Sequence, residues 1–199
     1  MFSVNIDKLI NMTKEESKSY EDIADTVILK CESGCHSLAV TGIGVSAFKL
    51  ASAVVRKGKK VLFVDADFDK DIFISKYRLG KNILGIADYI ISDVEFKNIV
   101  CNTNIDTFKV VFTGNISDKD ELDISVRRVE TFIDETRDYD LVIILTDEKN
   151  TMAQCCDETL AIVGESQINS DVETELSKLT KRLTKNGCNV WGVVVDECN

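Results

Sequence analysis

A strand pattern, two glycines and a helix pattern follow one another in the order of a phosphate-binding turn. Leu38–Thr41 is a short apolar run, and Ser46–Lys57 carries its apolar residues at helical spacing. Gly42 and Gly44 lie between them, and a residue without a Cβ lets the backbone approach a ligand closely. The first N–H groups of a helix are unpaired and attract anions. We therefore expect Gly42, Gly44 and Ser46 to contact a phosphate-bearing cofactor.

Two carboxylates follow the next apolar run of the chain. Asp65 and Asp67 come directly after Val61–Val64, which is typical of a parallel strand buried on both faces. Ligands of open α/β sheets bind at the carboxyl ends of the strands. We therefore take Asp65 and Asp67 as cofactor-binding candidates, and as the catalytic candidates if the protein is active. Thr146, a hydroxyl after the apolar run Leu141–Leu145, joins the cofactor-binding set.

Two nucleotide motifs compete for the glycine turn. Gly42-Ile-Gly44-Val-Ser-Ala47 matches the dinucleotide fingerprint, and Asp65 stands where the ribose-binding acid belongs. The P-loop requires Gly-x-x-x-x-Gly-Lys-Ser/Thr, which the chain lacks. The residues of the glycine turn, taken alone, thus favour a Rossmann-type NAD(P)-binding oxidoreductase.

Three blocks elsewhere in the chain favour the P-loop class instead. Residues 49–67 resemble the Asn-Leu-Ala…Gly-Lys-Lys-Val-Leu-Leu-Ile-Asp-Ala-Asp block of the MinD/ParA-like deviant-Walker ATPases. Residues 139–146 resemble their Tyr-Asp-Tyr-Val-Ile-Ile-Asp-Thr strand, and residues 189–196 their Asn-Val-Leu-Gly-Val-Val-Leu-Asn strand. Within that superfamily the chain is similar to the cytoplasmic domain of bacterial tyrosine kinases (BY-kinases) of the capsule and exopolysaccharide type, whose first helix is placed like Glu15–Lys30. The resemblance covers about residues 15–199 and implies a three-layer P-loop NTPase-like α/β domain, with a mainly parallel central sheet and helices on both faces.

The residues that handle a triphosphate in that superfamily are missing. Ile43 or Gly44 falls where the P-loop lysine belongs, and Leu145 stands at the position of the Walker B aspartate. Asp147-Glu148 replaces a usual proline pair, and the chain has no proline. The tyrosine cluster that the kinases phosphorylate at their C-terminus is also absent.

These departures predict a degenerate protein. Loss of the lysine alone weakens triphosphate binding by about ten- to a hundredfold, and phosphoryl transfer depends on positioned cations. We expect a pseudo-ATPase or kinase-like protein that regulates or scaffolds a surface-polysaccharide or membrane-associated assembly. No cofactor is certain. Two alternatives stay open: a residual ATPase that binds ATP or ADP weakly with Mg²⁺, and the NAD(P)-binding oxidoreductase.

Length and charge bound the remaining possibilities. The 199 residues predict a single domain, 1–199, with residues 1–14 as a candidate flexible N-terminal arm. No apolar run approaches the roughly 18–20 residues of a membrane span, and the N-terminus lacks a signal-peptide profile. A cytoplasmic protein without direct membrane insertion is therefore expected. The net charge of −10 argues against a nucleic-acid partner.

The relatives suggest which partners to expect. They pair through the edge of the sheet that bears the site, so we expect a homodimer or a complex with a membrane-anchored activator, through Gly42–Ala47 and Asp65–Tyr77. The kinases assemble rings through a Glu-x-x-Arg-x-x-Arg motif in the first helix. The matching residues here are Lys18, Glu21 and Ala24, which argues against such a ring.

Seven cysteines raise the alternative of a metal site. Cys31-x-x-x-Cys35-His36 includes the only histidine and could supply three zinc ligands. The spacing is unusual, and no Cys-x-x-Cys pair is present. Cysteine also serves as a small apolar side chain in a reduced cytosol, so no metal site is predicted.

The patterns also predict the elements that position these residues. Strands are expected at Leu38–Thr41, Val61–Val64, Thr107–Phe112, Leu141–Leu145, Leu160–Val163 and Val190–Val195. Helices are expected at Leu84–Ile91, Val94–Val100 and Leu122–Arg137, and from Val172 to a stop at Asn186-Gly187.

Overall fold

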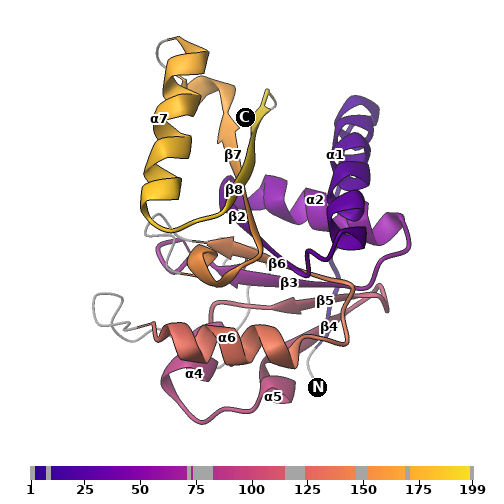
Figure 1. The fold of residues 1–199 in the computed structure, drawn as a ribbon. Coiled ribbons are helices and arrows are strands. Elements are labelled where there is room, and N and C mark those ends of the chain that lie inside the picture. The colour runs from indigo at the N-terminus through magenta and orange to yellow at the C-terminus, as the bar shows by residue number, and fades with distance from the viewer. Residues whose placement is uncertain are drawn as a thin grey trace.

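The computed structural model describes residues 3–7, 10–70, 73, 83–114, 124–146, 152–168 and 171–197. These residues form a sheet of eight strands in the order β1-β4-β5-β3-β6-β2-β7-β8 (Figure 1). Neighbouring strands are parallel except β4 and β5. The prediction of a mainly parallel α/β sheet is confirmed. The strands are β1 (Ser3–Val4), β2 (Ser37–Gly42), β3 (Val61–Ala66), β4 (Val100–Thr103), β5 (Phe108–Val111), β6 (Leu141–Thr146), β7 (Glu158–Gly164) and β8 (Val190–Asp196).

Helices cover both faces of this sheet (Figure 1). One core cluster contains the buried residues of α1 (Lys14–Glu32) and α2 (Gly44–Arg56). A second cluster, on the opposite face, contains those of α4 (Ile86–Ile91), α5 (Phe96–Ile99), α6 (Val126–Glu135) and α7 (Val172–Lys185). Two short 3₁₀ helices, η2 (Ala153–Cys155) and η3 (Glu165–Gln167), complete the elements of the described residues.

Burial on both faces explains the continuous apolar runs of the central strands. In β3, Phe63 belongs to the cluster under α2, whereas its neighbour Leu62 belongs to the opposite cluster. Side chains alternate between faces along a strand, so a strand covered on both sides must be apolar at every position. Phe48 of α2 packs its ring 4.9 Å from that of Phe63 and 5.2 Å from that of Phe108, measured between centroids.

The helix ends follow local sequence signals. Thr13 and Glu16 form a capping box at the start of α1, in which the Thr13 hydroxyl accepts from the Glu16 N–H and the Glu16 carboxylate accepts from the Thr13 N–H. Helix α7 ends at Lys185, and Gly187 adopts a φ of 87° just beyond it. The predicted stop at Asn186-Gly187 is confirmed, because glycine takes this left-handed conformation without a steric penalty.

Strand β4 corrects one sequence expectation. The helix expected over Val94–Val100 ends at Ile99, and the chain continues as a strand from Val100 antiparallel to β5. Cys101 and Thr103 alternate inward with 4% and 6% exposure. Pairing with β5 therefore overrides the helical spacing that the local sequence suggested.

The N-terminal segment contributes to the sheet edge. Ser3 and Val4 pair with Asn102 and Thr103 of β4. Ile6 has 0% exposure, and its N–H donates to the Asn104 side chain at 2.9 Å. This part of residues 1–14, for which we considered a flexible arm, thus packs against the core. In the described residues, none of the helices combines the length and the apolarity that crossing a bilayer requires.

Candidate functional site

The connection between β2 and α2 is a single residue. Strand β2 ends at Gly42, and α2 begins at Gly44, so that Ile43 alone joins them. Gly42 has a φ of 110°, and a Cβ built there would lie 1.9 Å from the carbonyl oxygen of Ile162 in β7. The close approach that requires a glycine at position 42 is therefore an approach to the neighbouring strand.

Ile43 is one of the two residues, with Gly44, that fall where a phosphate-binding lysine would be expected. Its N–H donates to the Ile162 carbonyl at 3.2 Å, and its side chain packs against the core cluster under α2. One N–H of the turn is thus already bound within the protein, and the side chain is apolar. The first turn of α2 carries no side-chain cap.

Ser46 contacts the end of the last strand. Its hydroxyl donates to Oδ2 of Asp196, and the Tyr20 hydroxyl of α1 donates to the same oxygen at 3.1 Å. Burial, together with the Asp196 carboxylate, raises the pKa of Tyr20. We had not singled out Asp196 from the sequence, although an acid at the carboxyl end of a strand is a signal that could have found it.

The lysine of the first turns of α2 is also engaged with α1. The Lys49 ammonium lies 2.6 Å from Oε1 of Glu16. Lys49 and the Thr13 N–H together lower the pKa of Glu16. This ammonium is directed towards α1.

Asp65 and Asp67 lie at the carboxyl end of β3 and are both buried. Asp65 is 0% exposed and accepts from the Thr113 hydroxyl at 3.2 Å. Asp67 is 2% exposed, and the Lys70 ammonium lies 3.7 Å from its Oδ2. Among the described residues, Oδ1 of Asp67 has no hydrogen-bond partner. Burial raises the pKa of Asp67.

Strand β6 lies between the two halves of the candidate site. Thr146 is aligned with Thr41 of β2 on one side and Ala66 of β3 on the other. Leu145, at the position of the Walker B aspartate, is 0% exposed and belongs to the cluster under α2. A buried apolar side chain thus lies on the face of the sheet where the Walker B carboxylate would be needed for phosphate chemistry.

Alternation along the strands separates Thr146 from the other candidates. Phe63 and Leu145 belong to the α2-side cluster, so Asp65 and Asp67 share that face, whereas Thr146 takes the opposite one. Its hydroxyl donates to the Val40 carbonyl at 3.4 Å. The structure therefore gathers the glycines, Ser46 and the two aspartates at one edge and on one face, and leaves Thr146 apart. Asp147-Glu148 lies outside the described residues.

The strand order argues against a dinucleotide site. In the Rossmann arrangement, the strand after the first helix lies directly beside the first strand. Here β6 intervenes between β2 and β3. With strands about 4.8 Å apart, Asp65 is roughly 10 Å of sheet away from the glycine turn. The dinucleotide fingerprint is therefore matched in sequence, by Gly42-Ile-Gly44-Val-Ser-Ala47 and Asp65, but the strand order is not that of a dinucleotide-binding fold.

The zinc alternative finds no support in the geometry. His36 Nε2 lies 3.1 Å from the Thr136 hydroxyl, and the Cys35 thiol is 3.7 Å from the Ser37 carbonyl. Burial raises the pKa of the Cys35 thiol to about 12, which disfavours the thiolate that a metal requires. In the described part of the chain, no group of three or more His, Cys, Asp or Glu residues is arranged for a metal ion.

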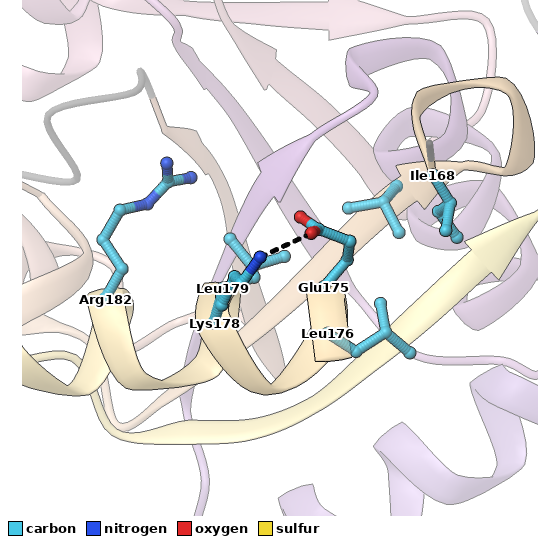
Figure 2. Close-up of a pocket in the computed structure, with 7 residues that line it drawn as sticks. Ile168, Glu175, Leu176, Lys178, Leu179 and Arg182 are labelled. Carbon is cyan, nitrogen blue, oxygen red and sulfur yellow. Dashed lines mark hydrogen bonds and ion pairs between the residues drawn. The ribbon is translucent and has the colours of Figure 1, made fainter. Parts of the chain in front are cut away.

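Two cavities flank the last strands. Figure 2 shows one of about 340 Å³ beside α7, where the Lys178 ammonium is 2.8 Å from Glu175 Oε1. It is lined by Val163, Ile168, Glu175, Leu176, Lys178, Leu179 and Arg182. The other, of about 260 Å³, lies between the start of α1 and the end of β8. Acids including Glu15, Glu16, Asp196 and Glu197 line the second cavity. The sequence patterns predicted neither of these two cavities.

Comparisons with known proteins agree with this architecture. No family model matches the chain. The tyrosine-protein kinase CpsD of Streptococcus pneumoniae serotype 4 is 22% identical over 163 residues, covering 78% of this chain and 70% of the relative. CpsD of Streptococcus agalactiae serotype III is 19% identical over 165 residues, covering 79% of this chain and 70% of the relative.

Solved structures share the fold. The kinase domain of the Escherichia coli tyrosine kinase ETK superposes with a TM-score of 0.75 at 19% identity, covering 90% of this chain and 74% of that domain. MinD of Pyrococcus horikoshii, solved with Mg-ADP, gives a TM-score of 0.62 at 15% identity, covering 82% of this chain and 71% of that one. The chain is therefore similar in sequence to CpsD-type tyrosine kinases, and it shares the fold of bacterial tyrosine-kinase domains and of MinD.

Proposed function

We propose that this protein is a kinase-like component of surface-polysaccharide synthesis that regulates or scaffolds its assembly without turning over ATP. The observation that carries the proposal is the direct junction between β2 and α2. A phosphate loop needs several residues whose N–H groups converge on the anion. Here one residue, Ile43, joins strand and helix, and its N–H is bound to Ile162.

The side chains around the junction support the same conclusion. Ile43 supplies no cation, and Leu145 supplies no carboxylate. A charge-assisted hydrogen bond contributes about 1.5–3 kcal/mol, so the missing lysine alone weakens binding by roughly ten- to a hundredfold. Phosphoryl transfer depends more strongly still on positioned cations. Catalysis is therefore expected to fail before binding does.

A second candidate function, weak binding of a Mg²⁺–nucleotide without turnover, is favoured by Asp67. Its buried Oδ1 has no partner among the described residues, and carboxylate oxygens are ligands that Mg²⁺ accepts. Asp65 and Asp67 would hold the metal, and the first N–H groups of α2 would face a phosphate. The carboxylates fit a Mg²⁺ ion, whereas the one-residue junction fits a triphosphate poorly.

Phosphate release from Mg-ATP tests the proposal. We expect turnover far below about 1 per second, the lower end of ordinary enzymes. A CpsD-type kinase assayed in parallel is the positive control. Turnover above that value, abolished by Asp65→Asn and Asp67→Asn, would show that this site is an active ATPase.

Calorimetric titration separates the remaining alternatives. ADP and Mg-ATP probe residual nucleotide binding, and NADH and NADPH probe the oxidoreductase alternative. We expect weak or no heat with the adenine nucleotides and none with the dinucleotides. Tight NADH binding would overturn both the proposal and the assignment of the glycine turn.

A scaffold also requires a partner. We propose a membrane-anchored activator or a second copy of the chain, because the kinase relatives suggest both. Co-purification with the membrane components of the polysaccharide machinery is the measurement, and a protein recovered free of them would count against this role.

A further inference from the structure

Strand β8 is an open edge of the sheet. It ends the strand order and pairs with β7 alone among the described strands. All seven of its residues are partly exposed. Figure 1 shows β8 rising between α7 on one side and α1 on the other. A free edge of this kind is a template for another strand.

This edge lacks most of the features that block strand addition. Residues 190–195 contain no charged residue and no proline. The register shift against β7 falls at the start of β8, where Trp191 is the extra residue. From Gly192 to Asp196 the pairing with β7 is regular. Proteins usually protect exposed edges with lysine, proline or bulges. The regularly paired run Gly192–Asp196, which is uncharged as far as Val195, therefore points to an occupant.

Charged residues flank both ends of this edge. Helix α1 runs from Lys14 to Glu32, and its residues Glu15 and Glu16 lie beside the end of β8. Near its other end, the Lys30 ammonium is paired with Glu158 at 2.9 Å and lies 5.6 Å from the centroid of the Trp191 ring. Strand β8 itself ends in Asp196 and Glu197.

Helix α7, on the other face, carries a charge gradient along the edge. Its first turn carries Glu173 and Glu175, and its last turn carries Arg182 and Lys185. Only residues 186–189 connect α7 to β8, so the basic end of the helix lies beside the start of the strand. The α7 side of the edge is therefore basic where β8 starts, and the edge is acidic where β8 ends.

We propose that two copies of the chain associate through antiparallel pairing of their β8 edges, which makes one continuous sheet across the dimer. Antiparallel pairing reverses the gradient, so the acidic end of each copy meets the basic start of the other. Parallel pairing would place acid against acid and base against base, which is unfavourable. Two-fold symmetry makes the contact self-complementary and closed.

The gradient distinguishes this occupant from others. A basic peptide would be attracted to the acidic end of the edge and repelled by the basic start. A second copy in antiparallel orientation would be attracted at both ends. The interface also differs from the dimer through Gly42–Ala47 and Asp65–Tyr77 that the kinase relatives suggest. It leaves the glycine turn free, so the inference does not depend on the proposed function.

Sedimentation velocity over a wide concentration range is the first test. We expect a monomer–dimer equilibrium whose dissociation constant rises with salt, because exposed charges are screened. Hydrogen exchange should show dimer-dependent protection of the amides of Gly192–Asp196. A monomer at every concentration, or protection confined to Gly44–Ala47, would overturn the proposal.

Charge reversal tests the orientation. Glu197→Lys and Lys185→Glu each alter an exposed residue at one end of the edge, and each should weaken the dimer by roughly three- to tenfold. The double variant should regain most of the wild-type affinity, because antiparallel pairing brings the exchanged charges together. Lys97→Glu is the matched control on α5, whose side chain is 73% exposed and paired with Glu95. An equal loss of dimer affinity in the control, or no recovery of affinity in the double variant, would exclude antiparallel β8 pairing. Thermal melting of each variant checks that it folds.

Discussion

Asp67 is a buried carboxylate whose charge is poorly compensated. It is 2% exposed, its Oδ1 has no hydrogen-bond partner among the described residues, and Lys70 lies 3.7 Å from its Oδ2. Removing a carboxylate from water disfavours its ionised form unless partners replace the lost hydration. This explains why burial raises the pKa of Asp67 above its usual value of 3.8. Such a group costs stability at neutral pH.

The variant Asp67→Asn should be more stable than the wild type at pH 7. A raised pKa means that the folded protein holds this proton more tightly than the unfolded chain. The contribution of Asp67 is therefore most favourable below the unfolded-state pKa and is lost as pH rises through the folded-state pKa. We expect the free energy of unfolding to rise by on the order of 1 kcal/mol, or the melting temperature by about 2–4 °C, and this gain should shrink at acid pH. Thermal denaturation at pH 7 and pH 4 measures it.

Asp106→Asn is the matched control, since Asp106 is exposed. It should leave the melting temperature nearly unchanged. A loss of stability in Asp67→Asn at pH 7 would mean that the ionised carboxylate makes a favourable contact that the described residues do not account for.

Helix α1 is held in place by polar contacts as well as by its apolar face. Only three of its residues, Tyr20, Ala24 and Val27, are buried. Polar contacts along its length join it to the rest of the protein. They are Glu16–Lys49, Tyr20–Asp196, Asp25–Lys57 and Lys30–Glu158. The position of α1 over α2 and β8 therefore depends on side chains far apart in the sequence.

Tyr20→Phe tests this docking. It removes one hydrogen bond to the Asp196 carboxylate from a residue that is 7% exposed. A hydrogen bond to a charged group contributes about 1.5–3 kcal/mol, so we expect a loss in that range in the free energy of unfolding from urea denaturation. Ser46→Ala combined with Tyr20→Phe should be non-additive, because both hydroxyls donate to Asp196 Oδ2.

Tyr139→Phe makes the same atomic change at a tyrosine whose ring lies under Lys60, with the ammonium 4.9 Å from the centroid. This variant should lose little free energy of unfolding, because it leaves the aromatic ring in place. If the two tyrosine variants lose the same stability, Asp196 does not anchor α1.

At the scale of the whole molecule, two core clusters share one sheet. The strands β2, β3 and β6 contribute side chains to both clusters. Neither cluster can therefore lose its packing without exposing the strands that support the other. This arrangement favours unfolding as one cooperative unit, consistent with the expectation of a single domain.

Differential scanning calorimetry tests that expectation. We expect one transition with an unfolding enthalpy of about 140 kcal/mol near 60 °C, from the usual value of roughly 0.7 kcal/mol per residue. The calorimetric and van't Hoff enthalpies should agree. Two resolved transitions would show that the chain unfolds as more than one cooperative unit.

The sequence by itself determined most of the elements and the class of the fold. Apolar runs such as Val61–Val64 and Leu141–Leu145 are typical of strands buried on both faces, and the stripe of α7 and its glycine stop mark a helix and its end. These signals are local, because they depend on residues within a few positions of each other. The glycine turn and the two aspartates were located in the same way.

The tertiary structure decided what those residues contact. The insertion of β6 between β2 and β3 separates Gly42 from Asp65 and removes the dinucleotide interpretation. The contact of Ser46 with Asp196 joins residues 150 positions apart. Strand β4 forms because β5 offers it a partner. Pairing between distant segments depends on which strands become neighbours, and no local pattern encodes that choice.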